Sequence, residues 1–192
     1  MKGHQLLIEY APRFVAELPK GAAMVEVGSE RGHGSTLALA EMCKANGFTF
    51  TTVDVDPAIS ADAGTIVRGI SETFDAVCDY GERFLETTPR TFHMAYLDAF
   101  DFYHPHHPAD RIAAYQSRGT EITDDNAAAM HLACAKALKR SLAIGGYVCF
   151  DDILTAGPEW KGKGRDAIPW LIANGFDLLE WRRTTAMLKR LA

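Results

Sequence analysis

Three glycines in one short loop are the residues of this chain best suited to hold a ligand. Gly28, Gly32 and Gly34 follow the apolar run 24–27 and precede the helix-forming segment 35–40. This pattern is typical of a strand, a tight turn and the start of a helix. Glycine allows φ values that are closed to other residues and lets a ligand approach the bare backbone. Because a helix start offers free N–H groups and a partial positive charge, we expect a nucleotide or a carboxylate at this loop.

Acidic side chains form a second set, because they end three further runs of apolar and β-branched residues. Asp54 ends the first of these runs, Asp98 ends the next, and Asp151 and Asp152 end the last. The carboxyl ends of parallel strands meet at one edge of an open α/β sheet, where such sheets bind ligands. A carboxylate accepts two hydrogen bonds from a diol, so Asp54 suits the ribose of an adenosine.

The spacing of the glycines separates two classes of cofactor. The dinucleotide fingerprint places its first two glycines one residue apart, whereas Gly28 and Gly32 have three residues between them. Glu26 lies two residues before the first glycine, where its carboxylate suits an ammonium group and would repel a pyrophosphate. An NAD(P)-dependent oxidoreductase is therefore the less favoured alternative.

The glycine loop and the first acid together point to a known family. Residues 26–34 read Glu-Val-Gly-Ser-Glu-Arg-Gly-His-Gly and resemble motif I of class I S-adenosylmethionine-dependent methyltransferases. Residues 53–57, Val-Asp-Val-Asp-Pro, resemble the acidic end of the second strand in that family. The order of elements is similar over nearly the whole chain. The resemblance implies a methyltransferase with S-adenosyl-L-methionine as its cofactor.

The resemblance also implies which residues bind the cofactor. The backbone of the glycines would lie against the methionine part of the cofactor, with Glu26 near its amino group. Asp54 would bind the ribose hydroxyls. The cofactor-binding set is Glu26, Gly28, Gly32, Gly34, Ser35, Asp54, Asp79, Tyr80, Glu82 and Asp98. A helix-capping turn is an equal alternative to adenine contact for the three members 79, 80 and 82. Arg31, in the same loop, is placed to contact a carboxylate.

The later acids resemble the metal ligands of small catechol-type O-methyltransferases and their bacterial relatives. Those enzymes hold a divalent cation with an acid after the fourth strand and an acidic pair after the fifth. Neighbouring strands lie roughly 4.8 Å apart, so Asp98, Asp151 and Asp152 can meet on one ion, and oxygen ligands favour Mg²⁺. The resemblance thus implies metal-assisted O-methylation of a small molecule. The alternative is that one of the paired acids caps a turn and that Asp98 binds substrate or cofactor without a metal.

The residue that could serve as general base differs from the one used in that family. Catechol-type enzymes carry a lysine shortly after the first metal acid, and residues 98–103 contain none. Asp101, His104 and His107 are the candidates, because histidine exchanges a proton near neutral pH. Metal-independent N- or O-methylation with one of these groups as base is the alternative function. The alternative for the histidines is an exposed, proline-stiffened loop or a lid without chemistry of its own.

The elements that must position these residues alternate between strand and helix. This alternation predicts an α/β fold, with a Rossmann-like seven-stranded mostly parallel sheet, helices on both faces and a C-terminal antiparallel hairpin. We expect strands at 24–27, 48–54, 74–78, 93–98, 145–152, 176–181 and 184–191, and helices at 4–18, 35–46, 58–70, 81–85, 122–142 and 165–173.

The predicted domain is single and covers residues 1–192. It begins with a helical segment over 1–20, in which Pro12 predicts a kink or a break. An insertion or lid rich in proline and histidine covers 100–121. His131 falls on a later helix, at a position that allows it to face solvent.

Composition limits the partners of this chain. Its net charge of −5 over 192 residues gives no support for a nucleic-acid partner. The basic run of Lys161, Lys163 and Arg165 is expected to be a solvated loop. Four cysteines without CxxC spacing predict free thiols in a reducing compartment, three of them in apolar runs. With neither a signal peptide nor a membrane span among the first 19 residues, we expect a cytoplasmic protein that acts on a small molecule away from membranes. A homodimer is suggested by analogy with the family.

Overall fold

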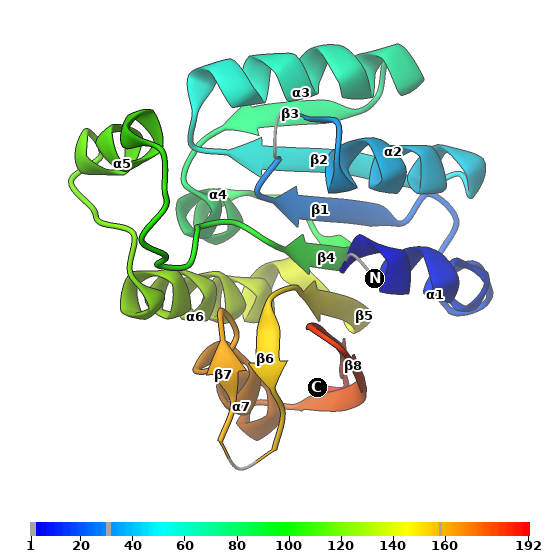
Figure 1. Ribbon diagram of the computed structural model, residues 1–192. Coiled ribbons are helices and arrows are strands. Elements are labelled where there is room, and N and C mark those ends of the chain that lie inside the picture. The colour runs from blue at the N-terminus through cyan, green and yellow to red at the C-terminus, as the bar shows by residue number, and fades with distance from the viewer. Residues whose placement is uncertain (1–2, 30–31, 158) are drawn as a thin grey trace.

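The computed structural model describes residues 3–29, 32–157 and 159–192, and a seven-stranded sheet forms its centre (Figure 1). The strand order is β3-β2-β1-β4-β5-β9-β8. The strands are β1 (Ala23–Val27), β2 (Thr49–Asp54), β3 (Asp75–Cys78), β4 (Phe92–Leu97), β5 (Leu142–Phe150), β8 (Phe176–Arg182) and β9 (Thr185–Arg190). The first five of these are parallel, while β9 runs antiparallel to both β5 and β8. The predicted mostly parallel sheet with a C-terminal antiparallel hairpin is confirmed.

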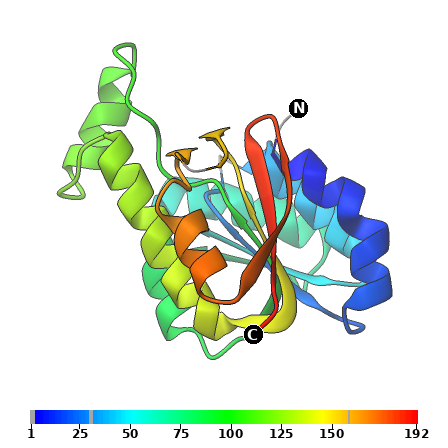
Figure 2. The same ribbon diagram turned by 90° about the horizontal axis from the view of Figure 1, so that it is seen from below.

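Helices cover both faces of this sheet (Figure 2). One face carries α1 (His4–Glu17), α2 (Ser35–Ala45) and α3 (Pro57–Ile70), and the other carries α4 (Gly81–Thr87), α6 (Asp124–Ser141) and α7 (Ala167–Ala173). Alternate strand residues point to opposite faces, so Met24 packs on the side of α1, α2 and α3, and Val25 packs on the side of α4, α6 and α7. Both faces of the central strands are therefore buried, which explains why these strands are nearly continuous apolar runs in the sequence.

Helix α1 is continuous, so the expected break at Pro12 is wrong. Leu7, Ala11 and Phe14 bury one side of the helix against the sheet, while Pro12 faces solvent on the other side. This packing compensates for the backbone hydrogen bond that proline cannot make. In the described part of the chain, no helix is long and apolar enough to cross a membrane.

Two features of the chain have no counterpart in the sequence prediction. The insertion contains a short helix, α5 (Ala109–Gln116), which buries none of its residues and lies beyond the carboxyl ends of the parallel strands (Figure 1). A small two-stranded ribbon, β6 (Ile153–Thr155) and β7 (Lys161–Gly162), follows β5.

All four cysteines are free, and Cys78 is exposed whereas the other three are buried.

Candidate functional site

The predicted site residues meet because five parallel strands end in register. Backbone hydrogen bonds continue the ladders one residue past the strands. Gly28 N donates to Val53 O, Asp98 N to Val27 O, and Asp151 N to Leu97 O, at 2.9 to 3.2 Å. Asp79 N likewise donates to Asp54 O. The glycine loop and the strand-end acids therefore share one edge of the sheet.

The glycine loop has the backbone conformation that its sequence predicts at two of three positions. Gly28 and Gly32 have φ values of 101° and 81°, in the left-handed region that favours glycine. A Cβ at Gly28 would lie 2.8 Å from the backbone of Ala99, so this position also needs the bare chain. Gly34 is the N-cap residue of α2 and has no side chain with which to cap the helix, which begins at the buried Ser35. Residues 30 and 31, and with them the expected contact of Arg31, lie outside the described residues.

Glu26 is a fully buried acid on β1. Its Oε2 lies 2.6 Å from the Thr36 hydroxyl and 2.7 Å from the Thr52 hydroxyl, and both donate to it. Its Oε1 has no hydrogen-bond partner among the described residues. Burial raises the pKa of Glu26 to about 7. An unpartnered buried carboxyl oxygen costs free energy until a donor meets it, so this atom marks a place for a ligand donor.

Asp54 lies beside the loop, at the end of β2. Its Oδ2 accepts a hydrogen bond from Ser29 N at 3.0 Å, and its Oδ1 accepts one from Asp56 N at 2.9 Å. These bonds fix the carboxylate, while each oxygen keeps a further lone pair for a diol. Asp56 caps α3 by accepting from the backbone of Ala58 and Ile59. It also pairs with Arg118 at 2.8 Å, which ties the insertion to this part of the site.

The residues after β3 are arranged as a helix start, and their role towards a ligand stays a prediction. Asp79 accepts from Tyr80 N at 2.7 Å and pairs with Arg83. Tyr80 occupies the N-cap position of α4 without a side-chain cap bond, and its side chain is exposed. Glu82, in the first turn of α4, lines a groove of about 620 Å³ on the outer face between α4 and α6.

The acids after β4 and β5 surround a buried lysine. Lys163 Nζ lies 2.9 Å from Asp98 Oδ1 and 2.8 Å from Asp152 Oδ2. Burial and the neighbouring acids raise the pKa of Asp98 to about 6, against the lowering effect of Lys163. Burial alone would lower the pKa of Lys163, but the charges of Asp98 and Asp152 raise it above its ordinary value, so this side chain is an ammonium. The expectation of a solvated loop is wrong for Lys163, and Lys161 is exposed but lies on the strand β7.

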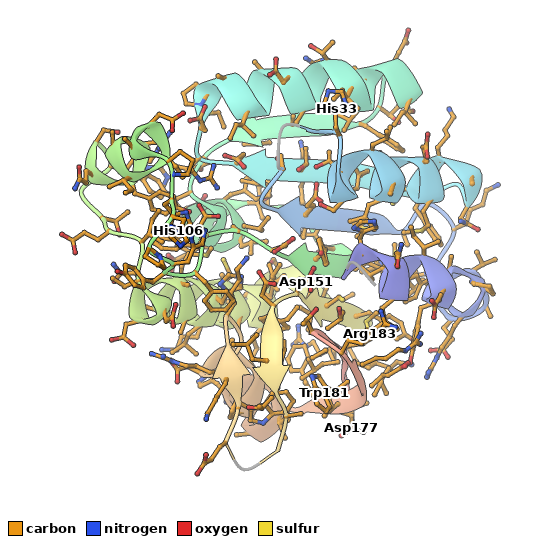
Figure 3. The ribbon with its side chains drawn as sticks, in the orientation of Figure 1. His33, His106, Asp151, Asp177, Trp181 and Arg183 are labelled. Carbon is orange, nitrogen blue, oxygen red and sulfur yellow. The ribbon has the colours of Figure 1, made fainter. Side chains whose placement is uncertain are left out.

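Asp151, which is labelled in Figure 3, accepts hydrogen bonds from neutral donors in three other parts of the chain. Its Oδ2 accepts from Gly3 N at 2.9 Å and from the Tyr96 hydroxyl at 3.0 Å. Its Oδ1 accepts from Asp152 N at 2.8 Å and from the Thr184 hydroxyl at 3.3 Å. The side chain thereby joins the N-terminal segment, β4 and the β8–β9 turn.

These residues do not fit the expected Mg²⁺ site. The ammonium of Lys163 stands between Asp98 and Asp152, and the oxygens of Asp151 are taken up by protein donors. Within the described ranges, no group of three or more His, Cys, Asp and Glu side chains is arranged to hold a metal ion. Sequence reasoning missed Lys163 because it lies 65 positions from Asp98.

The candidate bases in the insertion contact their own segment. The rings of His104 and His107 stack with centroids 3.6 Å apart, and His107 Nε2 lies 2.7 Å from Phe102 O. Burial raises the pKa of Asp101, but its hydrogen bond and charge contact with Arg111 outweigh burial, so the net effect is a lowered pKa. This ion pair leaves Asp101 poorly placed to take a proton.

His131 is buried, so the prediction that it faces solvent is wrong. Its Nδ1 lies 2.8 Å from Ala127 O, one turn earlier on α6, while its Nε2 has no hydrogen-bond partner among the described residues. Burial, followed by the nearby charge of Lys163, lowers its pKa to about 3. The ring is therefore neutral and packs beside Phe150.

Three described residues other than glycine have a positive φ; Arg183 lies in the β8–β9 turn, and the other two lie in loops at this same edge. Phe100 and Asp152 have φ values of 66° and 57°, which side chains other than glycine seldom adopt. Each residue lies within two positions of an acid at a strand end. Such strain is typical of functional sites, where the surrounding structure holds it in place.

Comparisons with known proteins show the fold of this chain. No protein-family model and no curated protein sequence matches it. SMU.1697c of Streptococcus mutans, provisionally assigned as a methyltransferase and solved with SAH, is 14% identical with a TM-score of 0.63, over 100% of this chain and 99% of that one. CalS11, a TDP-rhamnose 3′-O-methyltransferase, is 16% identical with a TM-score of 0.54, over 96% and 77%. A provisionally assigned rRNA methylase of Clostridium thermocellum is 8% identical with a TM-score of 0.54, over 95% and 94%. This chain therefore has a fold found in methyltransferases.

Proposed function

We propose that this protein is an S-adenosylmethionine-dependent methyltransferase. The observation that carries the proposal is Glu26, a buried acid next to the glycine loop, whose Oε1 has no partner within the part of the chain that the structure describes. The cofactor carries an ammonium group on its methionine part, which supplies both the missing donor and the opposite charge. The fold is shared with a structure that holds SAH, and this likeness supports the proposal.

With its ammonium group at Glu26, the other parts of the cofactor lie along the same edge of the sheet. The methionine part of the cofactor lies against the bare backbone of Gly28, Gly32 and Gly34, beside Ser35 at the start of α2. Asp54 binds the ribose hydroxyls with the lone pairs that Ser29 N and Asp56 N leave free. Asp79, Tyr80 and Glu82 border the adenine, and Asp98 borders the transferred methyl group.

The acceptor is a small molecule with an O–H or N–H group. Methyl transfer from a sulfonium is an in-line displacement, so the protein contributes mainly positioning and removal of the acceptor proton. His104 or His107 takes that proton, with the insertion over 100–121 as the acceptor's cover. The metal-assisted form of the reaction is not part of the proposal, because Lys163 stands where the cation is expected.

The charge of the site favours a small molecule over RNA. Three carboxylates, those of Asp98, Asp151 and Asp152, share this edge with one ammonium, and the whole chain carries a net charge of −5. Phosphates would be repelled at such a surface. CalS11, a TDP-rhamnose 3′-O-methyltransferase, supports a small-molecule acceptor but not the exclusion of phosphate, whereas the rRNA methylase neighbour supports an RNA acceptor. Salt-dependent binding of ribosomal RNA fragments would contradict the small-molecule proposal.

Calorimetry with SAH and NADH tests the cofactor. We expect SAH to bind with one site per chain and NADH not to bind, because the pyrophosphate of NADH would face Glu26. Binding of NADH together with no binding of SAH would instead support an oxidoreductase.

We expect SAH binding to release a proton. Glu26, with its pKa of about 7, is mostly protonated at pH 6 in the free protein. A bound ammonium favours the carboxylate, so the proton leaves as the ligand arrives. Calorimetry at pH 6 in buffers of different ionisation enthalpy measures this release, and we expect nearly one proton per SAH. Binding with no proton exchange would place the ammonium elsewhere.

We expect Asp54→Ala to weaken SAH binding by about 1–3 kcal/mol, or roughly 5- to 150-fold. The variant loses the hydrogen bonds from the ribose hydroxyls and the hold on Ser29 N. The matched control is Asp75→Ala, which removes an exposed acid at the start of β3, on the opposite edge of the sheet. Equal affinity in Asp54→Ala and the control would remove Asp54 from the cofactor site.

A further inference from the structure

A buried ammonium lies where the sequence predicts a metal ion. The side chain of Lys163 is 6% exposed, and its Nζ contacts one oxygen each of Asp98 and Asp152. Asp98 directly follows β4 and Asp152 lies two residues after β5. One cation therefore joins the carboxyl ends of the two neighbouring central strands, as a divalent ion does in the family that the sequence resembles.

The local chain is shaped to bring Lys163 to this position. Lys163 lies between Gly162, the last residue of β7, and Gly164. Gly162 has a φ of 101°, and a Cβ there would lie 2.1 Å from Asp152 O. A Cβ at Gly164 would lie 2.6 Å from the side chain of Ile153. Both glycines thus allow the chain to press against the β5–β6 turn, where Lys163 N also donates to Asp152 O at 3.2 Å.

The surroundings of the ammonium explain why a positive charge is needed there. A partly buried carboxylate without a nearby positive charge costs free energy of folding. Asp98 and Asp152 avoid this cost because they lie on either side of Lys163. The ring of Phe102 faces the ammonium, with 5.7 Å between Nζ and the ring centroid. His131, buried nearby, is neutral and adds no charge. Lys163 is the cation that balances this pair of acids.

We propose that Lys163 replaces the divalent cation and positions Asp98 and Asp152 towards the methyl acceptor, so that the transfer needs no metal. This inference rests on the proposed function of the site. The side chains of Asp98 and Asp152 are 29% and 42% exposed, so they are open to an acceptor while the ammonium behind them is covered. Lys163 is thus a positioning residue. The acceptor that these carboxylates orient presents O–H or N–H donors rather than phosphate or carboxylate groups.

Binding of Mn²⁺ alone tests this inference, with no need for the acceptor. We expect the wild-type protein to show no Mn²⁺ site by electron paramagnetic resonance titration in the millimolar range. Lys163→Met keeps the length of the side chain and removes its charge. We expect this variant to bind Mn²⁺ at least tenfold more tightly than the wild type and to gain thermal stability when Mn²⁺ is added. Lys163→Arg keeps the charge, and we expect no such gain.

Two results would overturn the inference. The first is a wild-type Mn²⁺ site that Asp98→Asn removes, since the cation would then bind despite Lys163. The second is a folded Lys163→Met protein without increased Mn²⁺ affinity. The wild-type measurement decides the question even if Lys163→Met does not fold. Absence of SAH binding would overturn the proposed function instead, so the two failures are distinguishable.

Discussion

Glu26→Gln is expected to stabilise the free protein above neutral pH and to weaken SAH binding. The folded state holds the proton of Glu26 more tightly than the unfolded chain, because burial raises the pKa from 4.5 to about 7. Stability from this group is therefore greatest below pH 4.5 and falls as the pH rises to 7. Glutamine carries no charge, so the variant avoids a cost on the order of 3 kcal/mol at pH 8.

The affinity changes in the opposite direction. The amide of Gln can still accept from Thr36 and Thr52, but it offers the ammonium of the ligand no charge. We expect SAH binding to weaken by on the order of 100-fold, about 3 kcal/mol. Urea unfolding at pH 5 and pH 8 and calorimetry with SAH measure the two effects. Glu41→Gln removes one charge from the exposed side of α2 and is the matched control. A variant with lower stability at pH 8 and unchanged SAH affinity would reduce Glu26 to a structural role.

The second large effect is expected from Asp151→Ala. The variant removes the carboxylate that accepts from Gly3 N and Asp152 N, and it leaves the buried Tyr96 hydroxyl with Asp98 Oδ2 at 3.3 Å as its acceptor. Each buried donor that loses its acceptor costs about 1–3 kcal/mol. We therefore expect the free energy of unfolding to fall by about 3 kcal/mol or more, with a matching loss in melting temperature.

Two further variants separate the structural role of Asp151 from a loss of charge. Asp151→Asn keeps one acceptor oxygen, so we expect it to lose less stability than the alanine variant. Asp177→Ala removes an exposed acid on β8, far from this site (Figure 3), and we expect less than 0.5 kcal/mol of change. A stable Asp151→Ala protein would show that these bonds do not anchor the N-terminal segment.

The fold and the cofactor edge could be predicted because their signals are local. Each strand is a short apolar run, and the residues that we propose to bind the cofactor lie near the carboxyl end of one or directly after it. Glu26 and Gly28 lie within one such segment, so their neighbourhood is set by chain connectivity. The parallel arrangement then brings Asp54 and Asp98 to the same edge, because all parallel strands end there.

The contacts of Lys163 and of the insertion could not be predicted because they join distant parts of the chain. The partners of Lys163 are Asp98 and Asp152, which belong to different strands, and a lysine in a glycine-rich run most often lies in solvent. The position of α5 depends on ion pairs of Arg111 and Arg118, which have no periodic pattern. Acids at strand ends look the same in the sequence whether they face a metal ion or a lysine.

A crystal structure of the protein with bound SAH tests the central claim most directly. We expect the amino group of SAH within hydrogen-bond distance of Glu26 Oε1 and the ribose hydroxyls at Asp54. We also expect the adenine beyond β3 and the sulfur facing Asp98. Density for SAH away from the glycine loop, or an SAH amino group that does not meet Glu26, would contradict the account.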